Sequence, residues 1–141
     1  MIEFENVVDY LPDSVHEIID IIGFASTEKL VQKLGGISFK FSEGKLYYPK
    51  LKEVLGDEKA KKLCDYFGGG ECYIPRCSVA LRKLRAQRLY ADFCYLTQQE
   101  GKSGRMAMLE ICPKYNISDR YAWQTIYSLQ SEENRSQSQL F

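Results

Sequence analysis

The first half of the chain repeats itself, and this repeat limits the possible fold more than any other feature of the sequence. Shifted by 33 residues without a gap, Leu30 aligns with Leu63. The same shift places the glycine pair at 35–36 on the pair at 68–69. In each copy a glycine ends one helical segment, a polar residue can cap the next, and the glycine pair stops it. The repeat therefore predicts one short helical unit that occurs twice.

Residues typical of strands follow both glycine pairs. Each segment closes on an aromatic residue, an apolar residue, a proline and a basic residue, at 47–50 and again at 73–76. Because proline has no amide to donate, it confines such a strand to a sheet edge or ends it. The first copy carries a longer insert, 37–46, whose composition favours a local hairpin.

Residues 15–22, which precede the glycine of the first copy, have the apolar spacing of a further amphipathic helix. Short helices and short strands bury little apolar surface, and small domains stabilise themselves poorly. We therefore expect residues 1–70 to form a helical dimerisation domain and residues 71–77 to form a linking strand. The expected dimer core consists of Ile18, Ile22, Leu30, Leu34, Leu63 and Phe67.

The net charge is zero, but the charges are unevenly distributed. Residues 1–28 contain seven acidic residues and no Lys or Arg, whereas residues 76–105 contain seven basic residues and two acidic ones. A concentration of positive charge favours binding to a polyanion such as DNA. On charge alone, an ordinary solvated helix face is the alternative. The expected contacts to the DNA backbone are Arg82, Lys83, Arg85, Arg88, Lys102 and Arg105.

The second half predicts three helices. Residues 78–97 have the pattern of one long basic amphipathic helix, which a polar segment containing glycine interrupts. Residues 105–115 predict the next helix, in which Pro113 should cause a bend or an early end because it lacks an amide donor. The last helix is expected to run from about Ser118 to Leu129.

The junction of the last two helices has the spacing of a helix-turn-helix. Asn116 tolerates the positive φ of a tight turn, and Ser118 can cap the helix that follows. Cys112 and Ile117 supply the small and the apolar residue that such a turn needs. A plain three-helix core remains the alternative interpretation of this pattern.

If Ser118 is the cap, one face of the last helix can enter a major groove. Arg120 could then pair with guanine and Gln124 with adenine, while Ala122 and Ile126 face the core. Trp123 and Tyr127 are more often partly buried than in contact with bases. The candidate residues of this recognition helix are Ser118, Asp119, Arg120, Trp123, Gln124 and Tyr127.

Three motifs, in this order, resemble the Mor/C family of phage transcription activators. They are Phe67-Gly68-Gly69 with residues 73–76, then residues 85–93, then residues 109–118, and the resemblance extends over about 50–128. The resemblance implies a homodimer, with an N-terminal helical dimerisation domain, a short strand as linker and two helix-turn-helix domains on successive half-sites. It also implies that the protein distorts promoter DNA and recruits RNA polymerase.

Carried over by position, the resemblance assigns Arg120, Tyr121 and Gln124 to the recognition helix. It also assigns a linker strand close to DNA. For Tyr73 and Ile74, packing at the dimer seam is an alternative to contact with DNA. The linker residues are Gly69, Tyr73, Ile74, Pro75 and Arg76.

No catalytic site is indicated, because His16 is the only histidine and no nucleophile, phosphate loop or carboxylate pair has a usable spacing. The five cysteines form no C-x-x-C pair, so no metal and no cofactor are expected. The sequence shows no leader and no apolar run of membrane-spanning length, which favours a cytoplasmic protein with reduced thiols and no membrane partner.

The expected fold class is mainly α with a short β element. The domains are expected at 1–70, 71–77 and 78–129, and residues 130–141, rich in Ser and Gln, should be a disordered tail. The expected function is sequence-specific transcription regulation by a dimer that binds a dyad promoter site. The alternative is a protein-interaction adaptor that keeps the fold without binding DNA.

Overall fold

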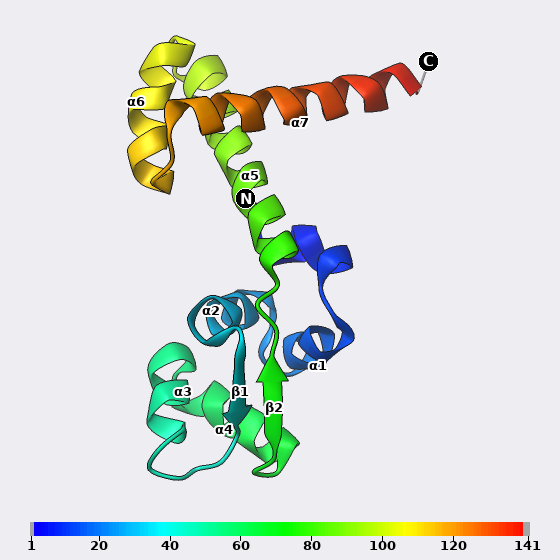
Figure 1. Ribbon diagram of the computed structural model, residues 1–141, viewed down its shortest axis with the longest axis vertical. Helices are drawn as coiled ribbons and strands as arrows, with labels where there is room; N and C mark the ends of the chain where they lie inside the picture. Colours follow the sequence, from blue (N-terminus) through cyan, green and yellow to red (C-terminus); the bar gives the residue numbers. More distant parts are fainter. Residues whose placement is uncertain (1, 140–141) are drawn as a thin grey trace. The chain divides into compact units, whose positions relative to one another are not determined.

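The computed structural model describes residues 2–139, which are mostly helical with one short two-stranded antiparallel sheet (Figure 1). The expected fold class is therefore confirmed. Contacts divide the chain into two compact units, of which the first comprises Glu3–Leu81 and the second begins at Arg82. Within residues 2–139, no helix combines the length and the apolar character that crossing a bilayer requires.

The first unit contains the order helix, helix, strand twice, as the repeat in the sequence predicted. A short 3-10 helix, Phe4–Tyr10, precedes the two copies. The first copy consists of α1 (Asp13–Ile22), α2 (Phe24–Leu34) and β1 (Ile37–Lys40), and the second of α3 (Tyr48–Leu55), α4 (Asp57–Phe67) and β2 (Glu71–Ile74).

A glycine joins the two helices of each copy in the same backbone conformation. Gly23 has φ 86° and ψ 170°, and Gly56 has φ 84° and ψ 167°. Residues with a side chain rarely adopt this conformation, so both turns depend on glycine. The expected polar caps are not used, because these glycines hold the capping positions of α2 and α4 without a side-chain hydrogen bond. Thr27 Oγ1 instead donates to the carbonyl of Gly23 at 2.7 Å.

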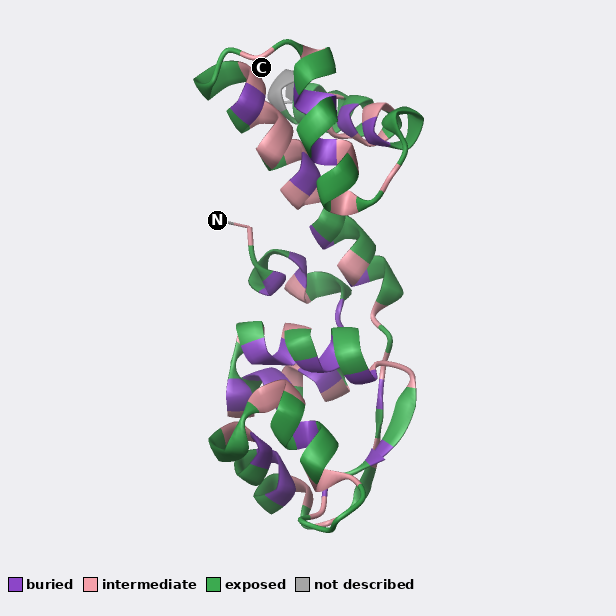
Figure 2. Ribbon diagram, turned by 90° about the vertical axis from the view of Figure 1, so that its left-hand side faces the viewer, coloured by how far each residue is buried: buried purple, intermediate pink, exposed green. Residues whose placement is uncertain are grey.

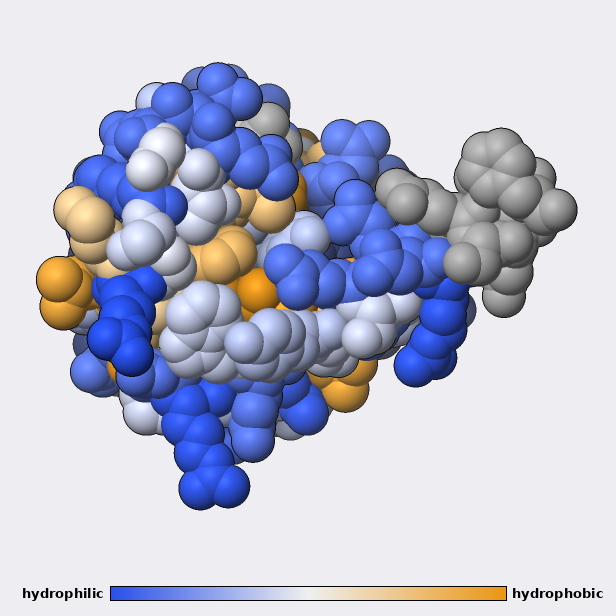
Figure 3. Space-filling model, turned by 90° about the horizontal axis from the view of Figure 1, so that it is seen from above, coloured by the Kyte–Doolittle hydropathy of each residue, from blue (hydrophilic) through white to orange (hydrophobic). Residues whose placement is uncertain are grey.

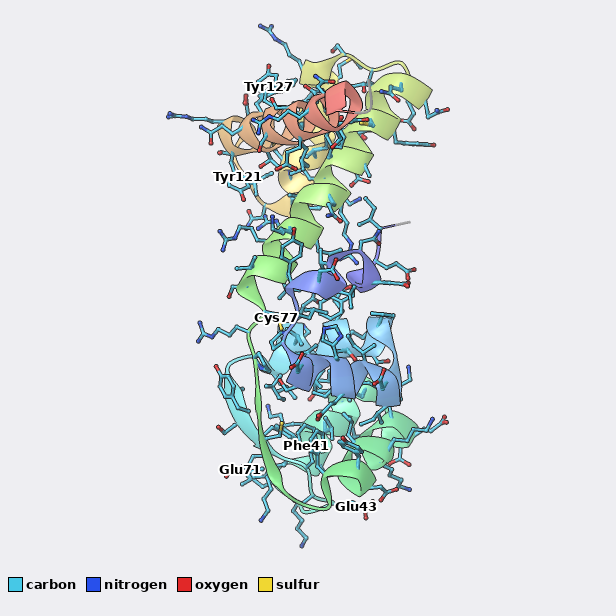
Figure 4. All side chains as sticks on the ribbon, turned by 90° about the vertical axis from the view of Figure 1, so that its right-hand side faces the viewer. Phe41, Glu43, Glu71, Cys77, Tyr121 and Tyr127 are labelled. Carbon is cyan, nitrogen blue, oxygen red and sulfur yellow. The ribbon has the colours of Figure 1, made fainter. Side chains whose placement is uncertain are left out.

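The insert 37–46 does not form the expected local hairpin. Its strand β1 pairs antiparallel with β2, so that Ile37 lies opposite Ile74. A two-stranded hairpin on its own is marginally stable, whereas the pairing of β1 with β2 buries Phe39 and Ile74 on one face of the ribbon. Phe41, just beyond β1, is labelled in Figure 4. It is fully buried and stacks on Phe67 with ring centroids 4.5 Å apart.

The expected strand end at 47–50 is also wrong, because Tyr48 begins α3. Pro49 lies in the first turn of that helix, where its missing amide hydrogen has no partner in any case. The likeness of residues 47–50 to residues 73–76 is therefore not a structural equivalence.

The residues predicted as a dimer core lie in the core of a single chain (Figure 2). Within the first unit, α1 packs on α4 and α2 packs on α3, so each copy covers the apolar side of the other. The burial for which a second chain was expected is thus available within one chain. Five of the predicted residues are buried and Phe67 is half-buried; the five are Ile18, Ile22, Leu30, Leu34 and Leu63.

The second unit has its own core. α5 (Ser78–Cys94) leads into it and ends in one turn of π-helix, Tyr95–Gln99, instead of continuing as an α-helix to residue 97. α6 (Gly104–Tyr115) and α7 (Asp119–Gln139) complete the unit, and α6 continues through Pro113 to Tyr115. The buried core residues are Leu89, Leu96, Ala107, Met108, Ile111, Ala122 and Ile126.

α7 continues to Gln139, so the expected disorder from residue 130 is not found in the described part of the tail. The Tyr90 hydroxyl on α5 donates to the Glu133 carboxylate at 2.8 Å. This hydrogen bond, with burial, raises the pKa of Tyr90 and ties the later part of α7 to α5. Residues 140 and 141 of the expected tail lie outside the described residues.

Candidate nucleic-acid interface

The turn between α6 and α7 has the local conformations predicted from the sequence. Asn116 adopts the left-handed region with φ 53° and ψ 52°, and its amide donates to the carbonyl of Cys112. Ile117 then packs against the core of the second unit. Ser118 Oγ accepts a hydrogen bond from the amide of Tyr121 at 3.1 Å and so caps α7. The left-handed conformation of Asn116 and the Ser118 cap therefore mark where α6 ends and where α7 begins.

We predict that Asn116→Val lowers the stability of the second unit by about 1–2 kcal/mol, because a left-handed conformation brings Cβ close to the backbone. Asn116→Gly should leave stability unchanged or raise it, since glycine has no such cost. Urea unfolding followed by tryptophan fluorescence measures both changes, because the single tryptophan, Trp123, lies in this unit. Equal stability of the Val and Gly variants would show that the turn does not depend on this conformation.

The start of α6 depends on two residues that the sequence analysis did not single out. Ser103 Oγ accepts from the amide of Met106 at 3.3 Å, and serine before a helix is a recognisable signal for such a cap. Gly104 lies under the indole, since a Cβ at this position would come within 2.6 Å of Trp123. No pattern in the sequence reveals this contact, because the two residues belong to different helices.

One face of α7 is exposed along the first two turns of the helix. Arg120 and Gln124 are exposed, whereas Ala122 and Ile126 on the opposite side are fully buried. Gln124 lies four positions after Arg120, so both side chains leave the same face of the helix. The neighbouring candidates Ser118, Asp119, Tyr121 and Tyr127 are exposed as well, and Figure 4 labels the two tyrosines.

Trp123 has a packing role within the second unit. Its ring meets Phe93 of α5 edge-on at a centroid distance of 5.5 Å and stacks on Tyr127 at 5.6 Å. With Gly104 below it, the indole joins α5, α6 and α7. Trp123 therefore packs between the three helices. Its partial burial agrees with the interpretation of this residue as part of the core.

The basic residues expected to contact the DNA backbone fall into two groups. Arg82 and Arg105 are exposed, and within residues 2–139 neither side chain makes a hydrogen bond or an ion pair. Lys83 and Arg88 already interact with other groups of the protein. Seen from above, the molecule presents a largely hydrophilic surface with small apolar areas (Figure 3).

Lys102 and Arg85 are committed to contacts within the second unit. Lys102 Nζ lies 2.5 Å from Glu110 and 3.1 Å from Glu100, and these two hydrogen bonds raise its pKa. Arg85 donates to the carbonyl of Tyr115 at the end of α6. Both cations therefore have protein partners that a phosphate would have to replace.

A family model described as the Mor transcription activator family matches residues 40–140. The chain belongs to this family. No curated protein and no solved structure matches the chain significantly. Membership in the Mor family identifies the protein as a transcription regulator, and it favours DNA as a partner.

The Mor match includes α6, the turn and α7, and also an acidic residue of α5 that binds the end of α6. Asp92 accepts hydrogen bonds from Lys114 Nζ at 2.7 Å and from the Tyr115 hydroxyl at 2.5 Å. Burial, together with the hydrogen bond to Asp92, raises the pKa of Tyr115. Sequence reasoning missed Asp92, since a lone aspartate within a basic helix carries no signal for this contact.

The Mor match also covers the residues assigned to the linker strand. Ile74 is fully buried in the first unit, whereas Tyr73, on the other face of β2, is 55% exposed. The turn residue Gly69 has φ 81°. Pro75 and Arg76 pass over the first glycine pair, where a Cβ on Gly35 would come within 3.2 Å of the Arg76 backbone. Of the two linker residues within β2, Tyr73 thus has the accessible side chain, whereas Ile74 is part of the core.

Proposed function

We propose that this Mor family member is a sequence-specific DNA-binding transcription regulator in which α6 and α7 form a helix-turn-helix. One observation carries the proposal. Arg120 in the first turn of α7 and Gln124 in the second leave the same exposed face, close to the Ser118 cap, where a recognition helix meets base edges. Arginine can bind guanine with two hydrogen bonds and glutamine can bind adenine in the same way.

The exposed cations Arg82 and Arg105 support the proposal, because phosphate contacts position a reading helix without adding sequence information. Tyr121, beside Arg120, offers a hydroxyl that can donate to a phosphate or a base. Homodimerisation and contact with RNA polymerase stay predictions of the family resemblance.

Salt dependence of duplex binding tests the proposal. The affinity for duplex DNA should fall steeply as ionic strength rises, because bound phosphates release counterions. Arg82→Ala and Arg105→Ala should each reduce the slope of log affinity against log salt by about 1. Lys102→Ala is the matched control and should leave the slope unchanged, because Glu100 and Glu110 already neutralise this lysine.

An adaptor that binds protein instead of DNA remains the second candidate, and one observation favours it. Leu109 on α6 is 77% exposed and Met106, one turn earlier, is 53% exposed, which is unusual for two large apolar side chains on one helix face. Absence of duplex binding above background at low salt would reject DNA recognition in favour of the adaptor. Selection of bound fragments from a random DNA pool would give the preferred site if DNA recognition holds.

A further inference from the structure

The two copies within the first unit are equivalent beyond their order of elements. Their joining glycines share one conformation, and several pairs of core residues 33 positions apart are buried in both copies. Ile18 and Leu51 are both fully buried, as are Leu30 and Leu63. The equivalence continues past the glycine pairs, because Phe41 after β1 and Ile74 in β2 are fully buried as well. The copies are therefore equivalent from α1 and α3 to the ends of their strands.

The packing between the copies has the pattern of a twofold axis. Exchanging the copies turns the contact of α1 with α4 into the contact of α3 with α2, and both contacts are present. In the sheet, Phe39 lies directly opposite Cys72, its own equivalent in the second copy. The flanking pairs, Ser38 with Tyr73 and Lys40 with Glu71, exchange with each other under the same operation.

A side-chain contact also joins equivalent positions. Lys59 Nζ donates to Ser26 Oγ at 2.5 Å, and these residues are 33 positions apart. A residue that contacts its own equivalent must lie close to the symmetry axis, as in the interface of a twofold dimer. The first unit is thus built like a symmetric dimer whose two halves belong to one chain.

The chain leaves the two equivalent strands in different ways. After Phe41 it continues into α3 and so begins the second copy, whereas after Ile74 it continues into α5 and the second unit. The Mor match begins at residue 40 and thus covers the second copy and the second unit, while most of the first copy precedes it. The twofold scaffold therefore carries one candidate DNA-reading unit instead of two.

We infer that the first copy takes the place that a second chain would occupy in a dimer. The protein is then a monomer with a single DNA-reading unit, in contrast to the homodimer that the family resemblance implies. The interface between the copies already buries their apolar faces, which removes the reason for association through this domain. The inference about the monomer depends on the first unit alone. The second part of the inference, that this monomer binds DNA through a single reading unit, rests on the proposed function.

Sedimentation equilibrium of the full chain tests the monomer directly. We expect a mass of 16.3 kDa that does not rise with protein concentration. A mass of two chains would overturn the inference. This includes a dimer in which each chain packs its first copy on the second copy of the other chain.

A cross-strand disulfide tests whether β1 and β2 pair within one chain. Ser38 and Tyr73 are exposed and directly opposite each other, and opposed antiparallel residues have the Cα separation that a disulfide needs. Oxidation of the Ser38→Cys, Tyr73→Cys variant should give a monomer that migrates faster without reductant than with it. The Tyr73→Cys single variant is the control and should show no such shift. A covalent dimer in the double variant alone would contradict pairing within one chain.

Binding to DNA tests the single reading unit. The probes are a duplex with one selected site and a duplex with two such sites as an inverted repeat. We expect one chain per site, no cooperativity, and an affinity for the double site within about twofold of the single site. Two chains on the single site, or a gain well above that factor on the double site, would overturn the inference. If neither duplex binds, the proposed function fails. The sedimentation result then still decides whether the protein is a monomer.

Discussion

Replacing Arg120 and Gln124 together by alanine is expected to abolish discrimination between the selected site and unrelated DNA. Each two-bond contact to a base contributes about 1–3 kcal/mol of discrimination, so the two losses together amount to about 30-fold to 10⁴-fold. Binding to unrelated duplex should fall much less, because phosphate contacts elsewhere remain. Competition of labelled site DNA with unrelated duplex at constant salt measures the ratio.

Arg135→Ala is the matched control for Arg120→Ala. It removes the same exposed cation from the same helix, but about 22 Å farther along the helix axis at 1.5 Å per residue. We expect this variant to keep full discrimination. If Arg135→Ala and the Arg120, Gln124 double variant lose discrimination equally, the reading face has been assigned wrongly. Circular dichroism of each variant checks that the fold is intact, since all three side chains are exposed.

Replacing Trp123 by alanine is expected to destabilise the second unit by about 3 kcal/mol. Loss of a core tryptophan costs about 3–5 kcal/mol, and the lower end applies because this indole is half-buried. The substitution removes the packing of the indole against Phe93, Tyr127 and Gly104. Urea unfolding followed by far-ultraviolet circular dichroism measures the change, and a separate transition for the first unit should stay in place.

Trp123→Phe distinguishes packing from contact with DNA. Phenylalanine keeps an aromatic ring against Phe93, so this variant should bind the selected site with nearly unchanged affinity. Trp123→Ala should bind as well as the wild type wherever it is still folded. A stable Trp123→Ala variant that no longer binds would instead make Trp123 a direct DNA contact.

The candidate site was predictable from the sequence where its geometry is local. Asn116 and Ser118 act within a few residues of themselves, so residue type and spacing were sufficient to predict the turn and the cap. The exposed position of Arg120 and Gln124 follows from helical periodicity once the cap is known. Partners of charged side chains were not predictable, which is why Lys102 was expected to face DNA but pairs with two carboxylates.

The sequence by itself determined the repeat, the glycines that join each helix pair and the order of the helices. These features depend on backbone conformation and on periodicity, which each segment carries within a few turns. Only the tertiary structure decided that β1 pairs with β2 and not within the insert 37–46, and that the expected dimer core closes within one chain. An apolar face requires a cover but does not specify which segment provides it, because burial is non-directional. That choice is made when distant parts of the chain pack together.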